Sequence, residues 1–390
     1  MAAPDHITTP LRIVVALDSF KGSVTSAQAC AAVREGSLRA APDAIVTVAL
    51  VADGGEGTLD ALARLGRPGA VDTIDLRGRP LRAAHVMLGD TAVIESATTV
   101  GLGLLDDVSP ASARRAHSYG LGLQLARVAE LENPSLILVG LGGTGCTDGG
   151  TGALLALGAR MWDVSGTELF AGDGVPDANP LLARPVRVLL PPTLACAVIG
   201  LADVNSPLLG PSGAARMFGP QKGADAPLVA ELEYAMEGWA LALREAGAEV
   251  SGVPGAGAAG GLGAAILTLG GRIEPGLQRI VAETGMGAAL AGADLVITGE
   301  GSLDAQTARG KVPDAIARLA KSSPPGGRVP VVVALAGRVE GDDHGALDAT
   351  FCIHPRPRPL AEAMNPEVTL AELSATAERV VRDFAAGMAL

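Results

Sequence analysis

The chain has 390 residues, 48% of them hydrophobic and 18% charged, so it is long enough for two domains with apolar cores and too apolar to be disordered. A net charge of -12 with no lysine- or arginine-rich run argues against a nucleic-acid partner, because binding a phosphate backbone needs a clustered basic surface. The longest uncharged stretch, 253–271, is glycine-rich and would make a poor membrane span, so we expect no membrane partner. Four cysteines without a C-x-x-C pair indicate neither a zinc ribbon nor a disulfide scaffold, and we expect a cytoplasmic protein.

Strand and helix patterns alternate from the first apolar run onward. A β-branched run predicts a strand at 12–17, and Thr25 with Gln28 forms a capping box that begins the next helix. A second strand at 45–51 precedes a helix at about 58–65. Further strands are predicted at 91–95, 135–139, 194–201 and 294–298. Strands that alternate with helices require right-handed crossovers, which predicts an α/β fold with mostly parallel sheets.

Three later segments lack chemical motifs. Apolar stripes at helical spacing over 229–243 and 370–384 predict two scaffold helices with charged outer faces. The stretch 171–192, rich in Gly, Pro and Asp, is predicted to be a long irregular connection.

Loops that follow the strands carry most of the chemically informative residues. They contain Asp, Glu, Lys and closely spaced glycines, in 17–23, 52–58, 142–152, 202–210, 218–225, 254–263 and 298–313. In open α/β sheets, ligands bind at the carboxyl ends of the strands. Lysines and amide N–H groups bind phosphate oxygens, and carboxylates hold Mg²⁺, so these loops favour an anionic substrate with a divalent metal.

The glycines of 142–152, GGTGCTDGGTG, admit a dinucleotide-binding alternative. Gly140, Gly142 and Gly145 match G-x-G-x-x-G directly after a predicted strand, and Asp163 lies at a suitable distance to meet a ribose. An NAD-dependent dehydrogenase is therefore one hypothesis. The glycines continue to Gly152, however, so the helix would open later than a dinucleotide-binding fold requires.

Phosphoryl transfer is the second hypothesis. The chain lacks the P-loop pattern and the protein-kinase motifs, but Lys21, Lys222 and Lys311 lie in glycine-bearing loops beside several carboxylates. Transfer from ATP needs charge stabilisation, Mg²⁺ and an acid-base group near the acceptor hydroxyl. These loops contain such groups, but the residues alone do not identify the substrate.

Five blocks carry a resemblance to a known family. They are ALDSFKGS, VADGGEGT, ADVNSPLLGPSGAARMFGPQKGA, PGAGAAGGLGAA and VITGEGSLDAQTARGKVP, and together they run through essentially the whole chain. The chain thereby resembles the bacterial glycerate kinases, which phosphorylate D-glycerate with ATP and Mg²⁺. The resemblance implies two α/β domains, one Rossmann- or flavodoxin-like and discontinuous, with the active site in the cleft between them. We place the discontinuous domain at 1–88 plus 275–390 and the inserted domain at 89–274.

The resemblance also implies a product and a set of roles. We expect the product to be 2-phosphoglycerate rather than 3-phosphoglycerate. We expect the protein to be a homodimer or a monomer. The predicted catalytic residues are Asp203, Lys222 and Lys21; the substrate-binding residues are Asp18, Ser19, Asp53, Asp148, Thr147 and Asn205; the cofactor-binding residues are Gly257, Gly260, Gly261, Glu300 and Lys311; and the metal ligands are Asp304 and Glu300. The bare amides of 142–152 are expected to approach the small acid or the transferring phosphate.

Structural alternatives stand beside several of these roles. Asp53 is equally suited to capping the helix near Thr58, and Asp203 to an Asx turn. For Glu300, Asp304 and Lys311 the alternative is structural ion pairing.

Some positions depart from the usual family pattern. Thr147 stands where an amide side chain is common, Leu121 and Leu123 replace a Thr and a Glu, and Ser302 often corresponds to a basic residue. These departures keep two further hypotheses open, a kinase for another small hydroxy acid and a catalytically silent hydroxy-acid sensor.

Overall fold

The computed structural model of the chain describes residues 10–20, 22–49, 51, 57–63, 65–172, 174–304, 312–322, 329–341 and 344–388. The chain divides into two compact units, unit 1 (residues 1–52 and 281–390) and unit 2 (residues 53–280). In the described ranges, no helix has the length and apolarity needed to cross a membrane.

Unit 1 is a parallel five-stranded sheet with helices on it. The strand order is β14-β13-β12-β1-β2, and every neighbouring pair is parallel, as the alternation of strands and helices predicts. The strands are β1 (Arg12–Leu17), β2 (Ile45–Val48), β12 (Leu295–Leu303), β13 (Val331–Val339) and β14 (Ala349–Cys352). The helices are α1 (Ser26–Ala40), α11 (Met286–Ala291), α12 (Val312–Ser322), α13 (Leu360–Ala363) and α14 (Pro366–Ala385).

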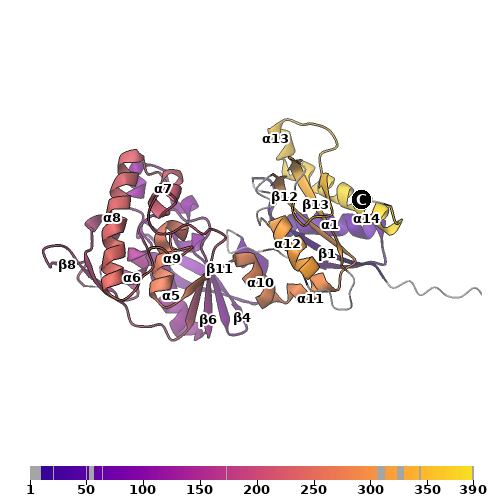
Figure 1. Cartoon of the computed structure of the whole chain (residues 1–390). Helices are drawn as coiled ribbons and strands as arrows, with labels where there is room; N and C mark the ends of the chain where they lie inside the picture. Colours follow the sequence, from indigo (N-terminus) through magenta and orange to yellow (C-terminus); the bar gives the residue numbers. More distant parts are fainter. Residues whose placement is uncertain are drawn as a thin grey trace, which may run out of the picture. The chain divides into compact units, whose positions relative to one another are not determined.

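The helices α1 and α14 lie side by side against the sheet (Figure 1). The core between them is formed by alternate residues of β1, β12 and β13 with one face of each helix, including Val33 and Val380. The capping box predicted at the start of α1 is confirmed, since Thr25 Oγ1 accepts from Gln28 N and the Gln28 side chain accepts from Thr25 N. This packing fixes the loop after β1.

Unit 2 contains a six-stranded sheet of order β11-β10-β6-β5-β4-β3, in which β5, β6, β10 and β11 are parallel and β3 and β4 are antiparallel. Its strands are β3 (Arg67–Ile74), β4 (Pro80–Leu88), β5 (Thr91–Glu95), β6 (Leu136–Gly140), β10 (Ala197–Leu201) and β11 (Arg272–Glu274). A small antiparallel sheet contains β7 (Arg160–Trp162), β8 (Glu168–Leu169) and β9 (Arg187–Leu189).

Helices of unit 2 pack in two layers. One core joins the main sheet to α5, α6 and α9, and a second joins α6 and α9 to α7, α8 and the small sheet. The α-helices are α2 (Thr58–Leu62), α3 (Ala97–Val100), α4 (Pro110–Ala113), α5 (Tyr119–Glu132), α6 (Thr151–Ala156), α7 (Ala214–Phe218), α8 (Ala226–Glu245), α9 (Ala258–Thr268) and α10 (Gly276–Thr284). Short 3₁₀ turns are η1 (Leu102–Leu104), η2 (Pro180–Ala183) and η3 (Pro220–Lys222).

Two features differ from the sequence-based expectation. Residues 53–88 were placed with the chain ends, but β3 and β4 pair with β5, so this stretch belongs to unit 2. The boundary at which the chain returns from unit 2 to unit 1 falls inside α10, after residue 280 rather than 274. The stretch 171–192, expected to be irregular, contributes η2 and the strand β9, which pairs with β7.

Candidate active site

The predicted site residues fall into one group in each unit. Lys21, Asp53 and Lys311 lie outside the described residues. The remaining ones follow the carboxyl ends of strands in both sheets or lie in loops packed there, where α/β folds bind ligands.

In unit 1, acidic residues follow two adjacent strands. Asp18 comes directly after β1, and its N–H donates to Gly299 O of β12 at 2.9 Å, which places Asp18 beside Glu300. Asp18 Oδ1 accepts from Ser19 N at 2.6 Å. Asp304 follows the end of β12. Asp18, Ser19, Glu300 and Asp304 therefore lie at or just before the carboxyl ends of two adjacent strands of this sheet.

This group has the donor chemistry for Mg²⁺. Glu300 lies near the end of β12, and Asp304 follows directly after it. Neither is fully buried. The described part of the chain contains no cluster of three or more His, Cys, Asp or Glu side chains that could hold a metal ion. Mg²⁺ commonly uses one or two carboxylates together with substrate phosphates and water, and two carboxylates suit that requirement.

In unit 2, Asp203 and Asn205 follow β10 and are exposed. Asp203 Oδ1 accepts from Gly276 N at 3.2 Å, so this carboxylate caps the start of α10 beyond the neighbouring strand β11. The contact orients Asp203 without removing it from solvent. Both a capping role and a catalytic role are compatible with this position.

The glycine-rich segment 142–152, which we call the glycine loop, is mostly enclosed by protein. Gly149 N donates to Gly260 O at 3.0 Å. A Cβ on Gly261 would lie 2.5 Å from Gly149 Cα, and one on Gly150 would lie 2.5 Å from Ala265 Cβ. These glycines are needed because two loops and α9 approach each other closely, not because a ligand approaches them.

This enclosure extends to the glycines predicted to bind the cofactor, Gly257, Gly260 and Gly261. Gly260 and Gly261 are buried and have φ values of 73° and 99°, inside the non-helical first turn of α9. A Cβ on Gly257 would lie 2.1 Å from Pro207 O. The structure therefore places all three predicted cofactor-binding glycines against protein atoms.

Asp148 organises the centre of the glycine loop. Its side chain is 0% exposed, and the carboxylate accepts from Ser118 N and Oγ, each at 2.8 Å, and from the N–H groups of Gly150 at 3.1 Å and Gly152 at 3.2 Å. Four donors satisfy this carboxylate within the protein. Its observed partners are thus loop and helix groups rather than the predicted substrate.

Lys222 also binds the glycine loop. It is 3% exposed, and its Nζ donates to Thr144 Oγ1 at 2.9 Å and to Cys146 O at 2.8 Å. Burial lowers the pKa of this ammonium to about 8, because charge is costly away from water. Lys222 was predicted to stabilise charge on the reacting groups. In the structure its ammonium contacts the glycine loop.

Thr147 is also enclosed, at 4% exposure. Its carbonyl accepts from Asn179 Nδ2 at 3.0 Å, and its buried Oγ1 has no hydrogen-bond partner among the described residues. The hydroxyl therefore does not reach solvent as a recognition group would.

The exposed part of the glycine loop is its beginning. Gly142 is half-buried and Gly143 is exposed, with Gly143 at φ 72°. Within the described chain, neither amide N–H donates a hydrogen bond to another residue. Consecutive amides in a turn of this kind form a concave anion-binding feature.

Sequence reasoning missed the residues that support this feature. Ser96, directly after β5, is 0% exposed, and its Oγ donates to Gly142 O at 3.5 Å. The preceding Glu95 is 6% exposed and accepts from Leu59 N at 2.6 Å, which anchors the start of α2. The sequence signal that could have identified Ser96 and Glu95 was their position at the end of a predicted strand.

The dinucleotide alternative does not fit this geometry. No helix begins directly after Gly145, as a dinucleotide-binding loop would require, because the next helix, α6, begins only at Thr151. Asp163 accepts from Ser165 N and Thr167 N, both at 2.9 Å, within the β7–β8 turn. It therefore closes a hairpin instead of lying beside the G-x-G-x-x-G loop.

Comparisons with known proteins agree with the resemblance. A family model described as the glycerate kinase family matches residues 13–385. The chain is 35% identical to Escherichia coli glycerate 2-kinase over 88% of this chain and 90% of that protein. It is 36% identical to Bacillus subtilis glycerate kinase over 97% and 98%. A crystal structure of a glycerate kinase 2 candidate from Salmonella typhimurium LT2 superposes with a TM-score of 0.80 at 32% identity, covering 97% of this chain and 99% of that one.

Proposed function

The chain belongs to the glycerate kinase family and is a kinase, and we propose that it transfers the γ-phosphoryl group of ATP to a hydroxyl group of D-glycerate, releasing ADP. The observation that carries this proposal is the family match over residues 13–385. The exposed groups at the carboxyl ends of both sheets supply the chemistry that the reaction needs. We further propose that the protein acts in the cytoplasm.

The amides of Gly142 and Gly143 support binding of a small carboxylate. Gly140 and Leu201 are paired residues at the ends of β6 and β10, so Gly142 and Asp203 each lie two residues beyond a paired position. Two N–H donors suit a carboxylate, and a neighbouring Asp suits a hydroxyl group. D-Glycerate carries both groups on adjacent carbons.

Asp203 is the proposed acid-base group. A carboxylate that accepts a hydrogen bond from the substrate hydroxyl orients it for attack and takes its proton as the new ester bond forms. The bond from Gly276 N holds Asp203 in place for this role. Asn205, also exposed after β10, is proposed to bind a second oxygen of the acid.

Glu300 and Asp304 are proposed to hold Mg²⁺ with the phosphates of ATP. The metal ion would neutralise charge on the phosphate oxygens during transfer. Asp18 and Ser19, beside Glu300, are proposed to bind substrate oxygens at the same end of the unit 1 sheet. Phosphate contacts by Lys21 and Lys311 and a substrate contact by Asp53 stay predictions.

We also propose that the 2-hydroxyl is the acceptor, giving 2-phosphoglycerate. The support is that the Escherichia coli relative is described as a glycerate 2-kinase.

Another small hydroxy acid is the second candidate substrate, because the family pattern is altered at several positions. Leu121 is 1% exposed and belongs to the core under α5, and Thr147 is enclosed. These two departures therefore change packing rather than the exposed edge of the glycine loop. Their location favours D-glycerate.

An ATP-coupled assay tests the proposal. We expect ADP release with D-glycerate, and turnover lower by roughly 10²-fold or more in Asp203→Asn, which keeps the side-chain shape and removes the base. Asp177→Asn is the matched control, because Asp177 is exposed in the same unit.

Three outcomes contradict parts of the proposal. Binding of D-glycerate without ADP release would identify a sensor. Faster turnover of another acid in a panel of hydroxy acids would overturn the substrate. Unchanged turnover in Asp203→Asn would remove Asp203 from the chemistry.

A further inference from the structure

The turn between β3 and β4 lies at the same end of the unit 2 sheet as the proposed acid-binding amides. Because β4 runs antiparallel to β5, this turn lies at the end of the sheet where β5 and β6 stop. Asp75, at 3% exposure, organises the turn: its Oδ1 accepts from Arg77 N at 2.8 Å and Arg79 N at 2.9 Å. The turn is thus a fixed platform for two arginine side chains.

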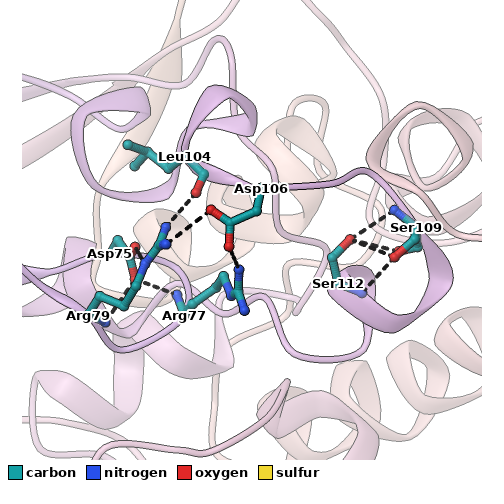
Figure 2. Close-up of polar contacts among 7 residues, drawn as sticks. All are labelled: Asp75, Arg77, Arg79, Leu104, Asp106, Ser109 and Ser112. Carbon is teal, nitrogen blue, oxygen red and sulfur yellow. Dashed lines mark hydrogen bonds and ion pairs between the residues drawn. The ribbon is translucent and has the colours of Figure 1, made fainter.

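Arg79 joins this platform to the segment 101–106 (Figure 2). Its Nε donates to Asp75 Oδ2 at 2.5 Å, one Nη to Asp106 Oδ1 at 3.2 Å, and the other Nη to Leu104 O at 2.7 Å. Arg77 pairs with the second oxygen of Asp106. Hydrogen bonds from these arginines, first from Arg79, lower the pKa of Asp106 and keep it ionised.

The segment 101–106 in turn fixes the glycine loop. Leu102 N donates to Gly143 O at 2.8 Å, and Gly145 N donates to Val100 O at 2.7 Å. A Cβ on Gly145 would lie 2.9 Å from Leu102 Cα, so the two backbones lie in close contact. The position of Gly143 therefore depends on the position of segment 101–106.

Little apolar burial holds this segment. Gly103 and Asp106 are exposed, and Leu104 and Leu105 are only partly buried. Ion pairs of this exposure contribute little to overall stability. Loss of the Arg79 contacts should therefore loosen the segment locally and leave unit 2 folded.

We propose that Arg79 is a positioning residue for the acid substrate, acting through segment 101–106 on the backbone of Gly143. This inference rests on the proposed binding of the glycerate carboxylate by Gly142 and Gly143. On this account Arg79 contacts neither D-glycerate nor ATP, and it affects the affinity for D-glycerate alone.

Steady-state kinetics of the full chain test this inference. In Arg79→Ala we expect the KM for D-glycerate to rise by about tenfold or more, since small displacements of binding groups are costly. The KM for ATP should stay within about twofold, and the thermal midpoint within about 4 °C. Arg79→Lys should recover part of the affinity, because an ammonium reaches fewer of the three acceptors. Arg82→Ala, an exposed arginine on β4 just after the turn, is the matched control.

Asp106→Asn provides a second variant with less effect on folding. It keeps the Arg79 bonds to Asp75 and Leu104, so we expect a smaller rise in the same KM. An unchanged KM for D-glycerate in Arg79→Ala, or equal rises for both substrates, would overturn the inference. If the unaltered protein releases no ADP with D-glycerate, the proposed function fails instead.

Discussion

Lys222 and the loop residue Asp148 are both buried and both hold the glycine loop in place. Each satisfies backbone groups of the glycine loop, Lys222 at Cys146 O and Asp148 at the N–H groups of Gly150 and Gly152. An unpaired buried polar group costs roughly 1–3 kcal/mol, so these contacts hold the loop in one conformation. We infer that they prepare the exposed amides of Gly142 and Gly143 without touching the substrate.

The buried ammonium predicts a pH dependence of stability. The pKa of Lys222 falls from 10.5 to about 8 on folding, so between these pH values the unfolded chain binds the additional proton. The free energy of unfolding should therefore rise with pH across this window, by up to about 3 kcal/mol from this group.

Urea unfolding between pH 8 and 10.5 measures this effect, with Lys222→Met as the comparison. Both proteins keep Cys146, whose thiol pKa is raised by burial, so the difference between them reports the lysine together with its interaction with this thiol. The stability difference should move in favour of the natural protein as pH rises. Parallel stability curves would show that Lys222 is not desolvated.

At the scale of elements, the glycine loop and the start of α9 approach each other so closely that a side chain between them would disrupt the contact. Gly261→Ala would force a Cβ to 2.5 Å from Gly149 Cα at a φ of 99°. We expect a loss of roughly 2–4 kcal/mol in the free energy of unfolding, from overpacking and backbone strain together.

Gly238→Ala is the matched control for this prediction. Gly238 lies inside α8, and a Cβ there meets no atom within 4 Å. The change should stabilise the protein by about 0.5–1 kcal/mol, because alanine favours a helix interior. Equal effects of the two substitutions would contradict the proposed interlocking of the loops.

Local sequence signals predicted some elements well. The strands β1 and β5 have the expected bounds, and the capping box of α1 is present. The antiparallel pair β3 and β4 was missed because their residues show no strong β-branched alternation, and pairing with β5 is a contact between distant segments.

The candidate site could be predicted only in part, for a related reason. A glycine in the sequence shows that something approaches the backbone closely, but not whether it is a ligand or another segment. For Gly149 the neighbour is Gly261, far along the chain. The carboxylates after β10 and β12, by contrast, lie where the predicted strand ends put them, because strand ends alone determine their positions.

At the scale of the whole molecule, the account requires a divalent metal together with ATP. Treatment with a chelator should abolish ADP release, and added Mg²⁺ should restore it, because Glu300 and Asp304 are proposed to hold the metal with the nucleotide phosphates. The double substitution Glu300→Gln and Asp304→Asn should raise the Mg²⁺ concentration needed for half-maximal rate. Full activity in chelator would contradict a metal requirement.

The position of phosphate in the product tests the central claim most directly. The protein is incubated with D-glycerate, ATP and Mg²⁺, and the product is examined by proton-coupled ³¹P NMR. We predict stoichiometric ADP and a phosphate ester split into a doublet by the single proton on carbon 2. A triplet from the two protons on carbon 3 would contradict 2-phosphoglycerate as the product, and the absence of any ester would contradict kinase activity on D-glycerate.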